Sequence, residues 1–326
     1  MRSVSRRRMH KAVVAAFGLS AIIPAAALAQ AYPTKPIRMV VAQAPGGPTD
    51  VVARIYATKL SEVLGQQVVV DNRVGAGGTI AGELIAHAPA DGYTLCVMAN
   101  GTLAIAPHFI KVTYRIHKDF APVALIGDSP LALMVTPSLA SSLKELIAVA
   151  KAKPGAINFG SSGQGSTGQL AAELFRTMAG IQLTHVPYKG ALPALVAVVS
   201  GEIQMLVSAL SSGHAFIKTG QVRALGVTGA KRVPALPDVP AIAEVLPGYE
   251  ANSWYAVLTR AGTPQLIIQR LNKASAQATS SPDTRARLVA ASVDPVTLTP
   301  EELGAKITRD YERWGKVVKA AGVKVQ

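Results

Sequence analysis

Two segments of the chain share one pattern, in which a short apolar run leads into a glycine-rich loop and then into a helical pattern. The first consists of the run 37–43, the loop 44–50 and the helical stripe 51–64. The second consists of the run 157–159, the loop 160–166 and the helical pattern 167–179. Strands that alternate with helices predict α/β domains with a largely parallel sheet. Ligands of such sheets bind beyond the carboxyl ends of the strands, where both loops fall.

A chain of 326 residues is long enough for about two domains. The repeated pattern therefore predicts two α/β lobes that face one cleft. Extended chain over 126–135 is broken near Pro130, and the region near Trp254 offers a return crossing. We assign residues 30–128 and 254–326 to the first lobe and residues 129–253 to the second.

The N-terminus has the pattern of a secretory signal peptide. A basic start precedes the apolar run 12–28, and Ala27-Leu28-Ala29 fits an A-x-A cleavage site. A membrane anchor is the alternative, but Pro24 interrupts the run and no strong stop-transfer pattern follows. We predict that residues 1–29 are cleaved and that the protein is periplasmic. Residues 5–11 also resemble a twin-arginine signal, so the export route stays open.

Charge and cysteine content exclude several classes of protein. The formal net charge of +14 falls to +9 when the five basic residues of segment 1–29 are removed, which favours anionic partners. No stretch of the mature chain concentrates Lys and Arg with interleaved aromatics, so we expect no nucleic-acid partner. Cys96 is the only cysteine, which excludes an intrachain disulfide and a zinc site of several cysteines.

The first loop offers an anion site at a helix start. Gly46 and Gly47 permit close approach of the backbone, and Thr49 or Asp50 is a candidate cap for the next helix. Oriented N–H groups and the helix dipole favour an anion at such an end. An ordinary capped turn is the alternative interpretation of this loop.

The second loop offers the same chemistry with more donors. Gly165 frees the backbone, while Ser161, Ser166 and Thr167 supply hydroxyl groups. Two neutral donor sets on opposing lobes would hold one carboxylate between them. The spacing Gly163-x-Gly165-x-x-Gly168 also fits a dinucleotide fingerprint, but the required acidic residue about 20 positions later is absent.

Enzyme signatures are missing from the chain. It contains no G-x-S-x-G elbow and no P-loop, and its six histidines lack the spacing of metal ligands. His185, at a strand end, is interpreted as a histidine satisfied by backbone groups. We therefore predict no catalytic residue, no metal and no cofactor.

Ten segments of the mature chain together resemble one family, the periplasmic receptors of tripartite tricarboxylate transporters, also called Bug receptors. They comprise residues 32–37, 44–50, 71–78, 91–95, 118–122, 150–155, 160–163, 185–190, 223–228 and 237–240. Each motif is weak alone, but their number, order and spacing are specific. The chain departs from the family at Gln169, where His or Asn is frequent, at Ser208, where Asp is frequent, and at Ala241, where Thr is usual.

The resemblance implies a two-lobed binding protein in which each lobe is a mixed sheet flanked by helices. It implies a small organic carboxylate held between the two loops, and a closed form delivered to the permease subunits of a membrane transporter. Carried over by position, the ligand-binding residues are Gly46, Gly47, Thr49, Asp50, Asn100, Ser161, Gly165, Ser166, Thr167 and Ser208. A monomer is the default expectation. A sensor that signals to a membrane kinase and a dinucleotide-binding enzyme are the alternatives.

Overall fold

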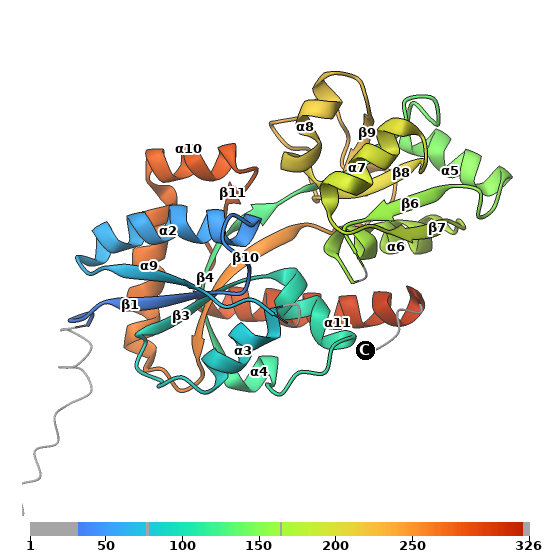
Figure 1. The fold of residues 1–326 in the computed structure, drawn as a ribbon. Coiled ribbons are helices and arrows are strands. Elements are labelled where there is room, and N and C mark those ends of the chain that lie inside the picture. The colour runs from blue at the N-terminus through green and yellow to red at the C-terminus, as the bar shows by residue number, and fades with distance from the viewer. Residues whose placement is uncertain (1–31, 76–77, 164, 322–326) are drawn as a thin grey trace, which may run out of the picture.

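Two β-sheets, each covered by helices on both faces, form the molecule (Figure 1). The computed structural model describes residues 32–75, 78–163 and 165–321. The predicted signal peptide 1–29 lies outside these residues. No helix in the described part of the chain is long and apolar enough to cross a membrane.

The first sheet has six strands and combines both directions. Its order is β11 (Asp294–Pro295), β4 (Phe120–Ser129), β10 (Ser253–Arg260), β3 (Thr94–Ala99), β1 (Ile37–Val41) and β2 (Val68–Asn72). Strands β1, β2 and β3 run parallel, while β10 pairs antiparallel with β3 and with β4. The carboxyl ends of the three parallel strands therefore meet at one edge of the sheet.

Helices cover the two faces of this sheet with different cores. One face packs against α2 (Pro48–Leu64), α9 (Gln265–Ser280) and α10 (Pro282–Ala290). The other packs against α3 (Thr79–Ala86), the short π-helical turn η2 (Gly101–Ile105), α4 (Ile116–Asp119) and α11 (Pro300–Ala321), with the single turn η3 (Ala106–His108) following η2.

The second sheet has five strands and the same layered plan. Its order is β7 (Thr184–Pro187), β6 (Asn158–Ser161), β8 (Met205–Ala209), β5 (Leu131–Val135) and β9 (Arg223–Val227). Strand β6 runs parallel to β7 and β8, and β5 runs antiparallel to β8 and β9. Helices α5 (Leu143–Ala152) and α6 (Thr167–Ala179) cover one face, and α7 (Ala191–Ser200) and α8 (Leu210–Lys218) cover the other. A short turn, η4 (Ile242–Glu244), precedes the return to the first sheet.

The chain crosses between the sheets at two neighbouring points. Pro130 joins β4 to β5, and Asn252 precedes β10. Thr228 ties the crossings together, because its Oγ accepts from Leu131 N at 2.9 Å and donates to Asn252 Oδ1 at 3.0 Å. Asn100 Nδ2 adds a bond to Asn252 O at 2.9 Å. Both crossings are thus held as one short strip.

One apolar core runs beneath both sheets. Helix α11 lies along both lobes (Figure 1) and packs against β4 and also against α6. Trp314 of α11 and Phe175 of α6 are both fully buried in this shared core. Trp254 Nε1 donates to Asp310 Oδ2 at 2.6 Å, which fastens α11 to β10. The C-terminal helix therefore belongs to the packing of both lobes.

The fold class expected from the sequence, two mixed sheets flanked by helices, is confirmed. Boundaries of the strand–loop–helix units agree within a few residues, and α6 begins and ends where predicted. The expectation of largely parallel sheets is wrong for β4, β5, β9, β10 and β11, because the chain leaves and re-enters each sheet by antiparallel strands. Helix α10 was not predicted.

Candidate functional site

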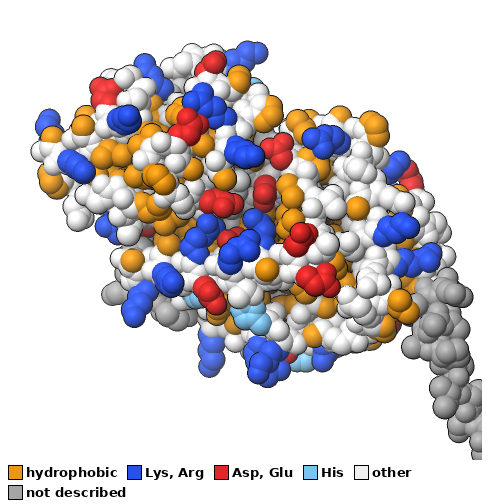
Figure 2. Space-filling view, turned by 180° about the vertical axis from the view of Figure 1, so that it is seen from behind, with side chains coloured by type: hydrophobic (Ala, Val, Ile, Leu, Met, Phe, Trp, Pro, Cys, Tyr) orange, Lys and Arg blue, Asp and Glu red, His pale blue; other side chains and the backbone are white. Residues whose placement is uncertain are grey.

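A cavity of about 420 Å³ lies between the two sheets at the carboxyl ends of their parallel strands. Ten of the described residues that line it carry a hydroxyl group: Thr49, Thr102, Ser129, Ser162, Ser166, Thr167, Ser208, Ser212, Ser253 and Tyr255. None of the lining residues in the described part of the chain is Lys, Arg, His, Asp or Glu. Elsewhere charged side chains abound, and on the face seen from behind both signs are interspersed (Figure 2). The cavity is thus a polar but uncharged site.

The ten residues predicted to bind ligand divide into two groups. Those that line the cavity are Thr49, Gly165, Ser166, Thr167 and Ser208. Gly46, Gly47, Asp50, Asn100 and Ser161 are not among its lining residues. Asn100 is fully buried, and its amide bonds the crossing strip through Asn252 O and Ser253 Oγ.

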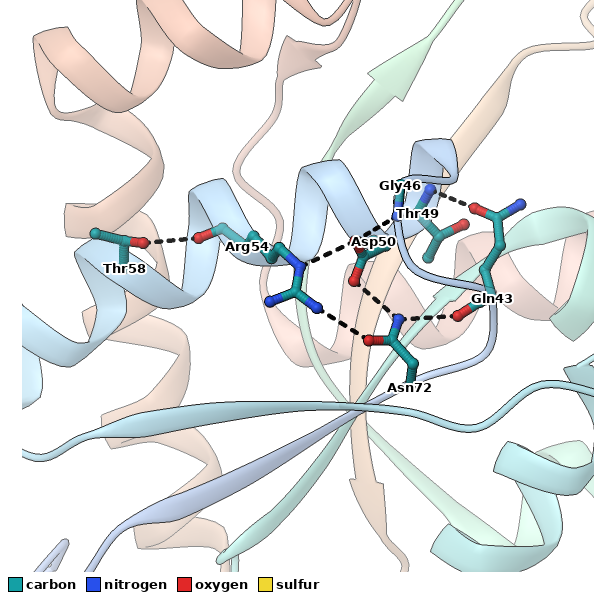
Figure 3. A network of polar contacts seen from close by, with 7 residues as sticks. All are labelled: Gln43, Gly46, Thr49, Asp50, Arg54, Thr58 and Asn72. Carbon is teal, nitrogen blue, oxygen red and sulfur yellow. Dashed lines mark hydrogen bonds and ion pairs between the residues drawn. The ribbon is translucent and has the colours of Figure 1, made fainter.

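A buried carboxylate organises the first loop (Figure 3). Asp50 is 2% exposed and accepts from Gly46 N at 2.9 Å, Arg54 Nε at 2.9 Å and Asn72 Nδ2 at 2.8 Å. Burial acts to raise the pKa of Asp50, but the hydrogen bonds from Arg54, Gly46 and Asn72 outweigh it and lower that pKa below its usual range. Asp50 therefore stays ionised and fixes the loop from behind the cavity.

The predicted cap of α2 is wrong. The N-cap residue is Gly47, with Pro48 at the first helical position, so Thr49 and Asp50 already lie within the first turn. Gln43, which sequence reasoning missed as a site residue, supplies the acceptor instead: its Oε1 takes the hydrogen bond of Thr49 N at 2.7 Å. A Cβ at Gly47 would lie 2.6 Å from Gln43 Cδ, so a larger residue there would displace the Gln43 side chain. The position of Gln43 at the end of an apolar run was the available signal.

A relay of three side chains organises the second loop. Gln169 Oε1 accepts from Gly165 N at 2.7 Å, so its amide nitrogen faces His185 Nδ1 at 3.2 Å. His185 Nε2 lies 2.7 Å from Ser161 Oγ, which donates to Gly163 O at 3.0 Å. Because Nδ1 must accept from the Gln169 amide, the neutral imidazole carries its proton on Nε2. The hydrogen-bond partners of His185 are therefore side chains. The sequence analysis expected backbone partners, and that interpretation is wrong.

Burial lowers the pKa of His185 below its usual range. A folded state that keeps this histidine neutral binds fewer protons than the unfolded chain, so stability falls as the pH drops below about 6.5. Protonation would also point an Nδ1–H at the Gln169 amide donor. We expect wild type to lose more unfolding free energy than His185→Gln between pH 7.5 and pH 5.0, measured by urea denaturation.

His108 provides the internal control for that comparison. Burial lowers its pKa as well, so it contributes to acid sensitivity in both proteins and cancels in the difference. Equal losses in wild type and variant would contradict the proposed protonation state of His185.

The two lobes touch across the cavity. Phe109, which follows η3 in the first lobe, packs so closely on the second loop that a Cβ at Gly165 would lie 2.1 Å from its Cζ. A Cβ at Gly101 would meet Thr167 Oγ at 3.2 Å. Gly165 also has φ +72°, a conformation that L side chains rarely adopt. The second loop is therefore shaped by a residue from the opposite lobe.

Several backbone N–H groups of the two loops donate hydrogen bonds to acceptors within the protein. Those of Gly46, Thr49, Gly163 and Gly165 donate to Asp50, Gln43, Ser161 and Gln169 respectively. The expectation that these backbone groups are free for a ligand is wrong at these four positions. Ten hydroxyl groups of the described lining residues remain as further polar groups around the cavity.

The family model "Tripartite tricarboxylate transporter family receptor" matches residues 52–323. The chain belongs to this receptor family. Among its relatives, Protein BugT of Bordetella pertussis is 37% identical over 319 residues, covering 97% of this chain and 98% of BugT. The resemblance drawn from the ten motifs is thereby confirmed.

Solved structures of other receptors with this fold contain carboxylates. Rpa4515 of R. palustris with adipate is 38% identical and superposes with a TM-score of 0.75. The match covers 90% of this chain and 99% of the Rpa4515 chain. MatC (Rpa3494) of Rhodopseudomonas palustris with bound malate is 32% identical and superposes with a TM-score of 0.70. The match covers 88% of this chain and 100% of the MatC chain.

Proposed function

We propose that this family member is a periplasmic receptor that binds a small organic carboxylate between its lobes and delivers it to the permease subunits of a tripartite membrane transporter. It acts without catalysis and without a cofactor. The observation that carries the proposal is the cavity between the sheets, which is lined by hydroxyls from both lobes and, among the described residues, by no charged side chain. Carboxylates bound by the two structural neighbours support the ligand class.

Specificity in this scheme comes from closure. A ligand that touches donors of both lobes binds the closed state more tightly than the open one, and so shifts the population toward closure. We place the hinge at Pro130 and Asn252, where the chain crosses between the sheets and Thr228 joins the crossings. The lobes are then residues up to 129 with 253–321, and residues 130–252.

A thermal-shift screen of the mature chain tests the proposal. The panel contains small carboxylates, amino acids, aromatic acids and nicotinamide dinucleotides. A ligand at 100 times its Kd stabilises the folded state by about 2.7 kcal/mol, which raises the melting temperature. A shift with one carboxylate class is expected; a shift with dinucleotides alone would overturn the receptor assignment. Refolded protein is screened in parallel, since ligand retained from expression would mask binding.

Two threonines of α2 give a matched pair for the same assay. Thr49 is 4% exposed and lines the cavity, and no hydrogen bond of its hydroxyl is found among the described residues. Thr58 is exposed and its Oγ donates to Arg54 O at 2.9 Å on the outer side of the helix (Figure 3). We expect Thr49→Val to reduce the ligand-induced shift and Thr58→Val to leave it unchanged.

A further inference from the structure

The outer face of helix α7 is apolar although it lies on the surface. Its ten residues, Ala191–Ser200, include no charged side chain. Leu192, Val196 and Val199 form one stripe at i, i+4 and i+7, and they are 60%, 52% and 37% exposed. Helix α5 on the same sheet has the same length but exposes two lysines and a glutamate. A helix that is apolar on nearly all sides is normally covered, so these three side chains, the α7 patch, point to a partner.

The surroundings of the α7 patch are polar. Lys189 precedes the helix and Glu202 follows it, and both are exposed. The Tyr188 hydroxyl donates to Glu202 Oε1 at 2.7 Å and so holds one side of this rim in place. Of the ten large apolar side chains that the described residues expose, three fall on this one helix. An apolar centre with a polar rim is the arrangement found in protein–protein interfaces.

The α7 patch begins beside the ligand cavity. Ala191, immediately before Leu192, lines the cavity from the second lobe, and Pro48 lines it from the first. Three residues after Pro48, Val51 of α2 is 40% exposed. Exposed apolar side chains therefore flank the cavity on both lobes. A partner that contacts both lobes there binds the closed and the open states with different affinities, because closure moves one lobe relative to the other.

Area and charge decide between the kinds of partner. The α7 patch exposes on the order of 250 Å² of apolar surface, so two copies that met through it would bury about 500 Å². Stable protein–protein interfaces bury about 1,200–2,000 Å², which argues against a second copy of this chain. Helices that lie on lipid surfaces carry Lys and Arg along their polar face, and α7 contains neither. A protein that is contacted transiently, through both lobes, fits the α7 patch best.

We propose that the α7 patch, together with Val51, is the surface through which this receptor docks on the permease subunits of its transporter. This inference rests on the proposed function, which supplies the permease as a partner. Delivery brings the permease to the ligand, and the α7 patch borders the cavity. The small contact area permits the receptor to leave again after delivery. The complementary surface of the permease is expected to be apolar and uncharged.

Binding to membrane vesicles tests this docking surface. Fluorescently labelled mature protein, with and without each carboxylate that raises its melting temperature, is titrated against right-side-out inner-membrane vesicles of the organism that makes it. Vesicles from a strain that lacks the permease genes and protein-free liposomes of the same lipids are compared. We expect saturable binding only to the vesicles that contain the permease. Equal binding to either comparison membrane, or no saturable binding at all, would overturn the proposal. The thermal-shift screen, which needs no permease, decides the proposed function separately.

Two substitutions of the same chemistry locate the surface. Val196→Glu places a charge at the centre of the α7 patch and is expected to weaken vesicle binding at least tenfold. Val289→Glu is the matched control, because Val289 of α10 is 50% exposed and lies outside both the α7 patch and the cavity lining. It should change vesicle binding less than twofold. Leu192→Glu, in the first turn where an acidic residue suits the helix, repeats the test if Val196→Glu folds poorly.

The ligand-induced thermal shift is the internal check on these variants. Val196, Leu192 and Val289 do not line the cavity, so all three variants should keep the wild-type shift. Equal losses of vesicle binding in Val196→Glu and Val289→Glu, or a loss of the thermal shift in Val196→Glu, would contradict a docking surface at α7. A wild-type dimer in sedimentation velocity that Val196→Glu dissociates would assign the α7 patch to a second copy instead.

Discussion

Asp50→Ala is expected to lower the free energy of unfolding by about 3 kcal/mol and to weaken ligand binding at least tenfold. The substitution removes the acceptor of three hydrogen bonds, from Gly46, Arg54 and Asn72, and bonds to a charged group contribute about 1.5–3 kcal/mol each when buried. Arg54 is half exposed and regains water, which limits the total. Urea denaturation and calorimetric titration of the same protein measure the two effects.

A second Asp–Arg pair in the chain serves as its control. Asp283 and Arg287 have the same i,i+4 spacing, but their closest charged atoms are 4.0 Å apart and Asp283 is 79% exposed. Exposed pairs contribute about 1 kcal/mol or less, so Asp283→Ala should leave stability and binding almost unchanged. Similar losses for both variants would show that Asp50 has no special role in shaping the first loop.

Gly165→Ala is expected to weaken ligand binding about a hundredfold, because the added Cβ opposes closure. The new methyl would lie 2.1 Å from Phe109 Cζ of the opposite lobe, and the φ of +72° adds backbone strain of about 1–3 kcal/mol. The double variant that combines Gly165→Ala with Phe109→Ala lacks the aromatic ring. It should regain part of the affinity, because only the backbone strain at residue 165 then remains. Calorimetry gives the affinities.

Gly180→Ala separates strain from the clash between lobes. Gly180 caps the other end of the same helix with φ +61°, and nothing lies within 4 Å of a Cβ placed there. We expect a stability loss of about 1 kcal/mol and unchanged affinity. If Gly180→Ala weakens binding as much as Gly165→Ala does, the contact with Phe109 is not what the second loop depends on.

The roles of several loop residues depend on contacts that the sequence does not show. Composition and spacing identified glycines and short polar residues after two strands, and both loops border the cavity. Asp50, Ser161 and Asn100 were predicted to bind the ligand. In the structure they form hydrogen bonds with Gly46, His185 and Asn252 respectively. A one-dimensional pattern shows which residues are near a strand end. It does not show which way each side chain points.

The contact between Phe109 and the second loop could not be assigned from the pattern. Phe109 lies far from Gly165 in the chain and has no motif of its own, but both residues line the cavity. His185 could be placed at a strand end, while its partners could not, because Gln169 and Ser161 reach it only through the pairing of β6 with β7.

The sequence by itself determined the α/β class, the two glycine loops and the family. These follow from local information: apolar periodicity sets strands and helices, glycine sets where the backbone turns, and the order of motifs is linear. Tertiary structure alone decided that the described residues lining the cavity carry no charge and that α11 is shared by both lobes. These properties depend on which surfaces meet when two sheets pack, since burial and hydrogen bonding are satisfied between residues that are remote in the chain.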